Sequence, residues 1–317
     1  MNKPMIVILN PASGSVDENY RPQIEKALQI RGAEFEVRET TKEKGGGELA
    51  AEAVREGATH LVACGGDGTV MAIVNGIGKN DPGSESQAQP SQVTLSIIPG
   101  GTANLLAAAL DIPTTIDEAV AVAVAGEDRE IDLGCCGEHL FALGLGLGLT
   151  ERLVSQASAQ QKEKFGKLAY AIAMLKELGA RPHTFSFKLD DKRSRRAKGV
   201  AIVIANAGEI GGGVRFAPRA KMDDGLLDLC ILHRFYFRDF LRMAIRGLLG
   251  QLQQDRAVSF FQARRVEIRS DPPLDLQIDG EEVDKEVPLV AEVKPKALRV
   301  RVPVPKQGET NENMKKG

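Results

Sequence analysis

Three apolar segments near the N-terminus each run directly into a polar turn that contains glycine. Residues 5–9 (MIVIL) precede NPASG, residues 60–63 (HLVA) precede CGGDGT, and residues 94–98 (TLSII) precede PGGTAN. Short continuous apolar runs are typical of strands buried on both faces, as in a parallel sheet. The carboxyl ends of parallel strands meet at one edge, where open α/β sheets bind ligands, so we expect the three turns to lie together.

Helical patterns alternate with these strands. Residues 22–31, 49–55, 70–77 and 104–110 follow successive strands, with a further strand at 35–38 and a last helix at 117–125. Alternation of strand and helix predicts a parallel sheet covered on both faces. The polar segment 78–92 is expected to be an exposed loop.

The pattern changes near Arg129, after which strands dominate. Many of them alternate apolar and polar residues, as half-buried antiparallel strands do. Two helices are expected among them, at 164–178 and 238–252. We therefore predict an α/β domain over residues 1–128, a mainly antiparallel sandwich or barrel over 129–305, and a polar tail over 306–317. The expected strands after residue 129 span residues 130–133, 140–143, 184–189, 200–205, 226–232, 265–268, 274–278, 289–293 and 298–302.

Charge and cysteine content exclude several classes of protein. The formal net charge of -2 provides no basic field for nucleic acid. The four cysteines form no C-x-x-C pair, so a zinc site is not expected and the thiols are expected to be free in a reducing compartment. No apolar run approaches the ~20 residues of a membrane span. We expect a cytoplasmic protein without a transmembrane segment; a homodimer is compatible with the sequence.

The turn GGDGT at residues 65–69 is the strongest local motif. Its glycines allow backbone N–H groups to approach an anion, and the helix that follows adds positive partial charge. Alternatively, it is a tight strand-to-helix turn in which Thr69 caps the helix. Three such turns at one edge of a sheet favour a shared anion or nucleotide site.

Two other glycine patterns of nucleotide-binding proteins do not apply to this chain. The chain contains no G-x-x-x-x-G-K-[ST] motif, so it is not a P-loop protein. Residues 144–148 (GLGLG) lack the spacing and the strand–helix–strand context of a dinucleotide fingerprint. Close packing of backbone at a domain junction is the favoured interpretation of that segment.

NPASG, GGDGT and PGGTANLLA, in this order, resemble the catalytic domain of the diacylglycerol kinase family, and most of all its soluble bacterial lipid kinases, relatives of sphingosine kinases. The resemblance extends through Asn206, a glycine run at 211–213, DDGLLD at 223–228 and QIDGE at 277–281, and covers nearly all of residues 5–302. GGDGT alone is shared with NAD kinases and phosphofructokinases. The family fold implies an α/β nucleotide-binding domain, similar to theirs, followed by a β-sandwich that completes the active-site cleft.

The resemblance also implies site residues. Asp279 is the family's proposed catalytic base, with Glu281 orienting either Asp279 or the metal; an ordinary Asp-Gly hairpin turn is the alternative. A magnesium ion is implied at the carbonyls of Lys221 and Leu226 and the carboxylate of Asp224, where a simple turn is again the alternative. The residues implied to line the ATP site are Asn10, Ser13, Gly14, Thr41, Gly65, Gly66, Asp67, Gly68, Thr69, Gly101, Thr102 and Asn104. Thr40 is adjacent to Thr41 and is the alternative for that threonine.

These features together predict a kinase that uses Mg-ATP and phosphorylates a lipid hydroxyl, such as that of diacylglycerol, presented at a membrane surface. A helix at 238–252 with arginines every four residues reads either as a membrane-surface helix or, preferably, as a helix packed on the sandwich. A basic run at 192–196 is expected at a strand connection. An NAD kinase or other small-molecule kinase, and a nucleotide-binding regulator without catalysis, are the alternative functions.

Overall fold

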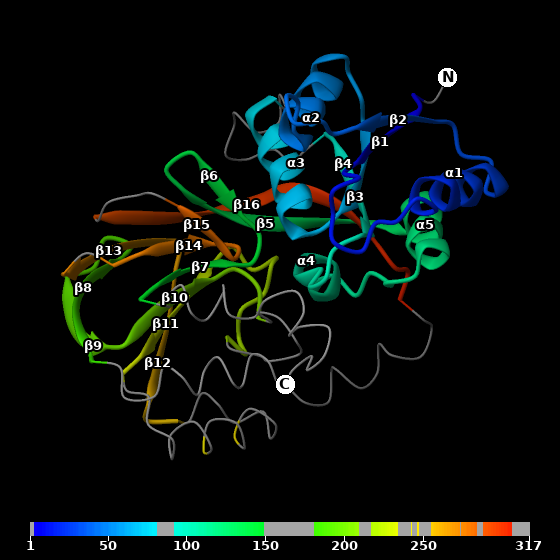
Figure 1. Ribbon diagram of the computed structural model, residues 1–317. Coiled ribbons are helices and arrows are strands. Elements are labelled where there is room, and N and C mark those ends of the chain that lie inside the picture. Colours follow the sequence, from blue (N-terminus) through cyan, green and yellow to red (C-terminus); the bar gives the residue numbers. More distant parts are fainter. Residues whose placement is uncertain are drawn as a thin grey trace.

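The computed structural model describes residues 3–80, 92–148, 181–208, 217–233, 255–272, 274–283 and 288–305, together with Arg242 and Arg246. Two sheets organise these residues, one of ten strands and one of six (Figure 1). The predicted helices at 164–178 and most of 238–252, the glycine run at 211–213 and the tail from 306 lie outside the described residues.

The first half contains a parallel sheet, as predicted from the apolar runs. Its strands pair in the order β2-β1-β3-β4, and every one of these pairs is parallel. The hydrophobic residues of β1, β3 and β4 are almost entirely buried, which explains their continuous apolar character. The four strands are β1 (Met5–Leu9), β2 (Phe35–Glu39), β3 (His60–Gly65) and β4 (Thr94–Pro99).

Helices cover both faces of this sheet (Figure 1). α1 (Tyr20–Ile30) packs with α5 (Ile116–Ala125) on one face, and α2 (Gly46–Arg55) packs with α3 (Asp67–Asn80) on the other. α4 (Leu105–Ala109) is a short helix after β4. α3 begins inside the 65–69 turn and includes residues 78–80, which were expected in a loop; residues 81–91 of that segment lie outside the described residues.

The second half is a β-sandwich whose strands are antiparallel. Its six-stranded sheet has the order β12-β11-β10-β7-β14-β15. Leu145, Ile204 and Leu229 of this sheet share one core with Phe185 and Ile268 of the larger sheet. The six strands are β7 (Gly144–Leu147), β10 (Ala201–Ala205), β11 (Leu227–Leu232), β12 (Val258–Ala263), β14 (Leu276–Ile278) and β15 (Glu281–Val283).

The remaining strands extend the parallel sheet into the second half. They are β5 (Glu127–Cys136), β6 (His139–Phe141), β8 (His183–Leu189), β9 (Arg195–Gly199), β13 (Arg265–Asp271) and β16 (Leu289–Val302). β16 pairs antiparallel with β5 and β13, and parallel with β4 through Arg299 and Val300. One strand therefore belongs to both halves of the molecule.

β16 corrects the expectation of two separate strands at 289–293 and 298–302. The register shifts between Lys294 and Leu298, and Lys296 has a φ of 52°. Pro295 has no N–H group to donate to a ladder. The strand therefore continues across an irregularity that interrupts the sequence pattern.

Four strands were not expected, namely β7, β9, β12 and β15. β9 (RRAKG) lies at the edge of the sheet and is mostly exposed and charged, and β15 has only three residues. β7 is the glycine segment at 144–148: a Cβ added to Gly144 would lie 2.7 Å from the carbonyl oxygen of Ile204. The glycines thus allow close backbone packing, as favoured above. Residues 192–194 of the basic run lie in the β8–β9 connection, as expected, and residues 195–196 begin β9.

Two arginines of the 238–252 segment contact a buried carboxylate. Arg242 donates two hydrogen bonds to Asp255, at 2.7 and 2.8 Å, and Arg246 lies 3.4 Å from the same carboxylate. These ion pairs hold the pKa of Asp255 below its ordinary value, the hydrogen bond from Arg242 being the main cause. The contacts fit a segment packed on the sandwich better than one whose arginines all face a membrane.

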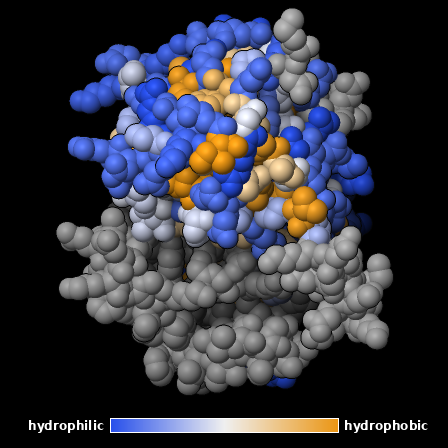
Figure 2. Space-filling model, turned by 90° about the vertical axis from the view of Figure 1, so that its right-hand side faces the viewer, coloured by the Kyte–Doolittle hydropathy of each residue, from blue (hydrophilic) through white to orange (hydrophobic). Residues whose placement is uncertain are grey.

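None of the described helices combines the length and apolar character needed to cross a membrane. Figure 2 views the molecule from the side of α1 and α5, where hydrophobic residues gather between hydrophilic ones. In the part of the chain that the structure describes, the exposed large hydrophobic side chains are Ile30 and Val304.

The contact between α2 and α3 generates a stability prediction. A Cβ added to Gly76 would lie 2.3 Å from the carbonyl oxygen of Gly47. Gly76→Ala should therefore force the two helices apart and lower the free energy of unfolding by about 1–3 kcal/mol, measured by denaturant titration. Gly45→Ser is the matched control, because Gly45 has open space around it, a φ of -80°, and an N-cap position that serine favours. Equal stability of the wild type and Gly76→Ala would refute the close contact.

Candidate active site

The three glycine turns meet at one edge of the parallel sheet. The N–H of Gly100 donates to the carbonyl of Gly65 (2.8 Å), and the N–H of Ser15 donates to the carbonyl of Gly100 (3.1 Å). The N–H of Gly66 donates to the hydroxyl of Ser13 (3.3 Å). The expectation that the turns lie together is confirmed.

Glycine is required where two of the turns touch. A Cβ added to Gly101 would lie 2.5 Å from the Cα of Gly66, closer than side-chain carbon can approach. The first turn, NPASG, lies beside them, since a Cβ on Gly14 would lie 3.4 Å from the hydroxyl of Thr102. The absence of side chains lets three backbone segments share one small region.

Asn10 connects the first turn to the second. Its Nδ2 donates to the hydroxyl of Thr69 (2.8 Å), and its Oδ1 accepts hydrogen bonds from the hydroxyl of Thr40 (3.2 Å) and the N–H of Ala12 (3.0 Å). Thr40, the alternative to Thr41 as the threonine near the nucleotide, is the one that contacts the first turn.

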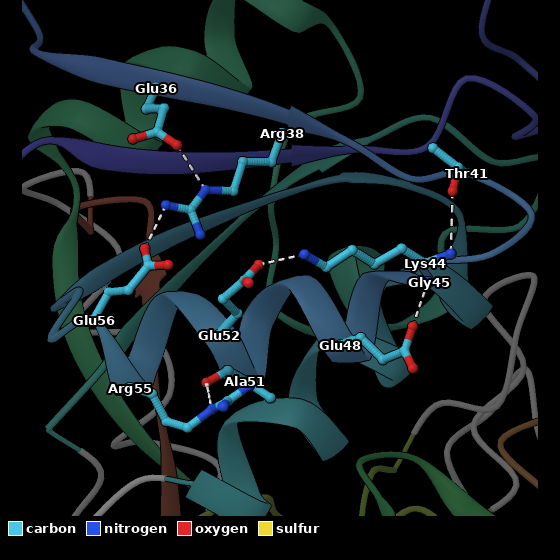
Figure 3. A network of polar contacts seen from close by, with 10 residues as sticks. All are labelled: Glu36, Arg38, Thr41, Lys44, Gly45, Glu48, Ala51, Glu52, Arg55 and Glu56. Atoms are coloured by element: carbon cyan, nitrogen blue, oxygen red, sulfur yellow. Dashed lines mark hydrogen bonds and ion pairs between the residues drawn. The ribbon is translucent and has the colours of Figure 1, made fainter.

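Thr41 has a different role in this structure. Its hydroxyl accepts hydrogen bonds from the N–H groups of Glu43 and Lys44, at 3.2 and 3.1 Å, in the turn before α2 (Figure 3). Glu48 closes the same helix start by accepting from the N–H of Gly45 (3.2 Å). Thr41 thus shapes the turn, and its contact with a nucleotide stays a prediction.

Asp67 and Asn104 hold the second and third turns in place. Oδ1 of Asp67, the first residue of α3, accepts from the N–H of Leu106 at 3.2 Å. Asn104 has a left-handed φ of 49°, and its carboxamide both accepts from and donates to the backbone of Gly101, at 2.9 and 2.6 Å. The side chains of these residues therefore already serve the geometry of the turns.

Asp279 lies in the turn between β14 and β15, with a left-handed φ of 48°. Its carboxylate accepts three backbone hydrogen bonds. The N–H groups of Leu143 and Gly144 donate to Oδ1, at 2.9 and 2.8 Å, and that of Ala142 donates to Oδ2 at 2.8 Å. These donors carry no side-chain signature, so the sequence could not reveal them.

The surroundings of Asp279 change its acidity. The pKa of the carboxyl group is raised from 3.8 to about 6, mainly by burial, with the negative charge of Asp67 acting in the same direction. The three N–H donors act in the opposite direction, because they stabilise the charged form. Asp279 is therefore an aspartate whose basicity is increased while its position is fixed.

A pocket joins the two halves of the molecule at this point. It encloses about 390 Å³, part of it open to solvent, and the carboxylates of Asp67, Asp279 and Glu281 line it. Glu281 reaches the start of α3: its Oε1 lies 2.6 Å from the position of a Cβ on Gly68. Met71, Leu140 and Val283 form an apolar part of the lining.

The expected magnesium ligands lie elsewhere, on the loop before β11. The N–H of Leu226 donates to Asp224 Oδ1 (3.0 Å), and the N–H of Gly225 donates to Asp132 Oδ2 (2.7 Å). Burial raises the pKa of Asp224, and the negative charges of Asp132 and Asp223 add to the effect. Within the described ranges, no three His, Cys, Asp or Glu side chains gather to hold a metal; the expected set contains one carboxylate only.

The chain resembles known kinases over most of its length. The family described as "Diacylglycerol kinase catalytic domain" matches residues 4–136, and "YegS C-terminal NAD kinase beta sandwich-like domain" matches residues 147–302. "Probable lipid kinase YegS-like" from Chromohalobacter salexigens is 31% identical over 279 residues, which cover 87% of this chain and 86% of that protein. "Diacylglycerol kinase" from Bacillus subtilis is 28% identical over 278 residues, 87% and 88% of the two chains.

A solved structure has the same fold. The crystal structure of a putative diacylglycerol kinase from Bacillus anthracis superposes with a TM-score of 0.77 at 20% sequence identity, covering 94% of this chain and 95% of that one. Family matches account for both halves, and the turns and the Asp279 hairpin lie where these halves meet. The chain therefore belongs to the family of lipid kinases that carry a diacylglycerol kinase catalytic domain.

Proposed function

We propose that this chain transfers the γ-phosphoryl group of Mg-ATP to a hydroxyl group of a lipid such as diacylglycerol. One observation carries the proposal: Asp279 faces the glycine-rich start of α3 across a single pocket. Phosphoryl transfer requires positioned phosphates, neutralised charge and an acceptor for the hydroxyl proton. The two sides of the pocket suit the first and the last of these requirements.

The converging turns are the proposed ATP site. The N-terminus of α3 presents backbone N–H groups and a positive partial charge, which attract phosphate. Asn10, Ser13 and Thr69 add polar groups around it. Gly14, Thr41, Gly65, Gly101, Thr102 and Asn104 would complete the nucleotide surroundings.

Asp279 is the proposed proton acceptor. Its Oδ1 accepts two N–H groups and its Oδ2 accepts one, so Oδ2 retains capacity for a substrate hydroxyl. A pKa of about 6 leaves the carboxylate ionised at pH 7 yet more basic than an ordinary aspartate. Glu281, beside Gly68 in the same pocket, would orient the reacting groups.

Magnesium is proposed to neutralise the ATP phosphates near Asp67 and to occupy a second, structural site. Burial raises the pKa of Asp224, and the negative charges of Asp132 and Asp223 add to the effect; a divalent cation bound to Asp224 would offset this repulsion. The carboxylate of Asp224 and the carbonyls of Lys221 and Leu226 would hold it. A cation there would stabilise the second half rather than contact the nucleotide.

A lipid substrate is supported by the names of the relatives and by the apolar part of the pocket lining. Met71, Leu140 and Val283 would contact apolar atoms next to the acceptor hydroxyl. The basic run at 192–196 would strengthen transient contact with a membrane that presents the lipid, from the cytoplasmic side. γ-Labelled ATP with a total lipid extract tests the function: a labelled lipid supports it, and labelled NAD without labelled lipid would support a small-molecule kinase instead.

Substituting the proposed base tests the chemistry. Asp279→Asn should lower kcat at least about 100-fold, because an amide cannot accept the proton, while the KM for ATP stays near that of the wild type. Asp275→Asn, an exposed aspartate in the segment leading into β14, is the matched control and should keep full activity. Full activity of Asp279→Asn, measured with the labelled lipid product, would show that Asp279 is not the base.

The acidity of Asp279 predicts a pH profile. Because the base must be deprotonated and its pKa is about 6, kcat/KM should be maximal above that pH and fall about tenfold per unit below it. An ordinary aspartate would keep its activity for about two more pH units of acidification. An activity that stays constant down to about pH 4.5, roughly half a unit above the pKa of an unperturbed aspartate, would contradict the assignment, provided that circular dichroism shows the enzyme to be folded.

A further inference from the structure

Asn206 is a fully buried polar residue that contacts the backbone segment holding Asp279. Its side chain has 0% exposure, and its Nδ2 donates to two carbonyl oxygens, those of Asp132 (2.9 Å) and Ala142 (2.8 Å). Carbonyl oxygens only accept, so the orientation of the carboxamide is fixed by its partners. Both donor hydrogens are thereby used.

The geometry of the peptide group connects these contacts to Asp279. In a planar trans peptide the C=O and the following N–H point in opposite directions. The carbonyl of Ala142 faces Asn206, and the N–H of Leu143 in the same peptide donates to Asp279 Oδ1 (2.9 Å). The next peptide repeats the pattern, with the carbonyl of Leu143 accepting from the N–H of Asn206 (2.8 Å) and the N–H of Gly144 donating to Asp279.

We propose that Asn206 is a positioning residue, which holds the 142–144 backbone from one side so that its N–H groups orient the Asp279 carboxylate on the other. The inference rests on the proposed function, in which Asp279 is the proton acceptor. Asn206 is itself anchored through Asp132, whose carboxylate accepts from the N–H groups of Gly225 (2.7 Å) and Lys296 (2.8 Å). These contacts connect the segment that binds Asp279 to β16, the strand shared by both halves.

The two atoms of the carboxamide contribute differently. Oδ1 of Asn206 is buried without a hydrogen-bond partner in the described part of the chain. An unpaired buried acceptor opposes folding, so the contribution of Asn206 comes from the two hydrogen bonds that its Nδ2 donates. The two N–H donors, aimed at Asp132 and Ala142, are what an apolar side chain could not supply.

A graded series tests the proposal. Asn206→Ala removes both donors and should lower kcat about 10- to 100-fold without changing the KM for ATP, because a misplaced base impairs chemistry and not nucleotide binding. Asn206→Ser retains one donor, so its kcat should lie between those of the wild type and Asn206→Ala. Ser96→Ala is the control: Ser96 is buried in β4 and bonded to His60 (2.8 Å), and neither residue lines the pocket, so this loss of a buried hydrogen bond should leave kcat unchanged.

A double substitution separates positioning from a general structural defect. If Asn206 acts through Asp279, Asn206→Ala should reduce the residual activity of Asp279→Asn no further. A full multiplication of the two losses, or a wild-type kcat in Asn206→Ala, would overturn the proposal.

Amide hydrogen exchange gives a readout that needs no activity. The Leu143 and Gly144 amides should exchange faster in Asn206→Ser than in the wild type, and unchanged exchange would overturn the proposal even if Asn206→Ala does not fold. If the wild type phosphorylates no lipid, the proposed function fails, and the exchange measurement still decides whether Asn206 positions this segment.

Discussion

The arrangement of the molecule depends on the pairing of β16 with strands of both halves. This strand pairs parallel with β4 of the α/β half and antiparallel with β5 and β13 of the second half. Its hydrogen bonds make the larger sheet continuous, so the two halves share a common framework. The hairpin that carries Asp279 is thereby brought to the carboxyl edge of β1, β3 and β4. The two halves are held together by a shared sheet, so the site between them does not depend on a separate interface.

Electrostatics at this site follow from the same framework. Asp67, Asp279 and Glu281 line one pocket, where their negative charges repel one another. Backbone N–H groups offset the repulsion: three bind Asp279, and that of Leu106 binds Asp67. In the described part of the chain, these main-chain N–H groups hold the carboxylates in place.

The sequence predicted the parallel sheet, the meeting of the three turns and the antiparallel second half, because each depends on local hydrophobic pattern or glycine placement. The continuity of β16 was hidden by Pro295 and the irregularity around it, and β9 and β15 lack an apolar face or sufficient length. Sequence position alone did not distinguish Thr40 from Thr41, and residue type does not reveal the main-chain N–H donors of residues 142–144. Asp279 itself came from the family resemblance, since an Asp-Gly pair alone indicates only a turn.

The central claim is that one phosphoryl-transfer site is assembled from the 65–69 turn and the Asp279 hairpin. A crystal structure of the chain with magnesium and a non-hydrolysable ATP analogue tests it most directly. The account predicts phosphates bound against the N–H groups at the start of α3, with the γ-phosphate facing Asp279. A nucleotide bound away from these turns, or a γ-phosphate turned away from Asp279 toward another acceptor, would contradict it.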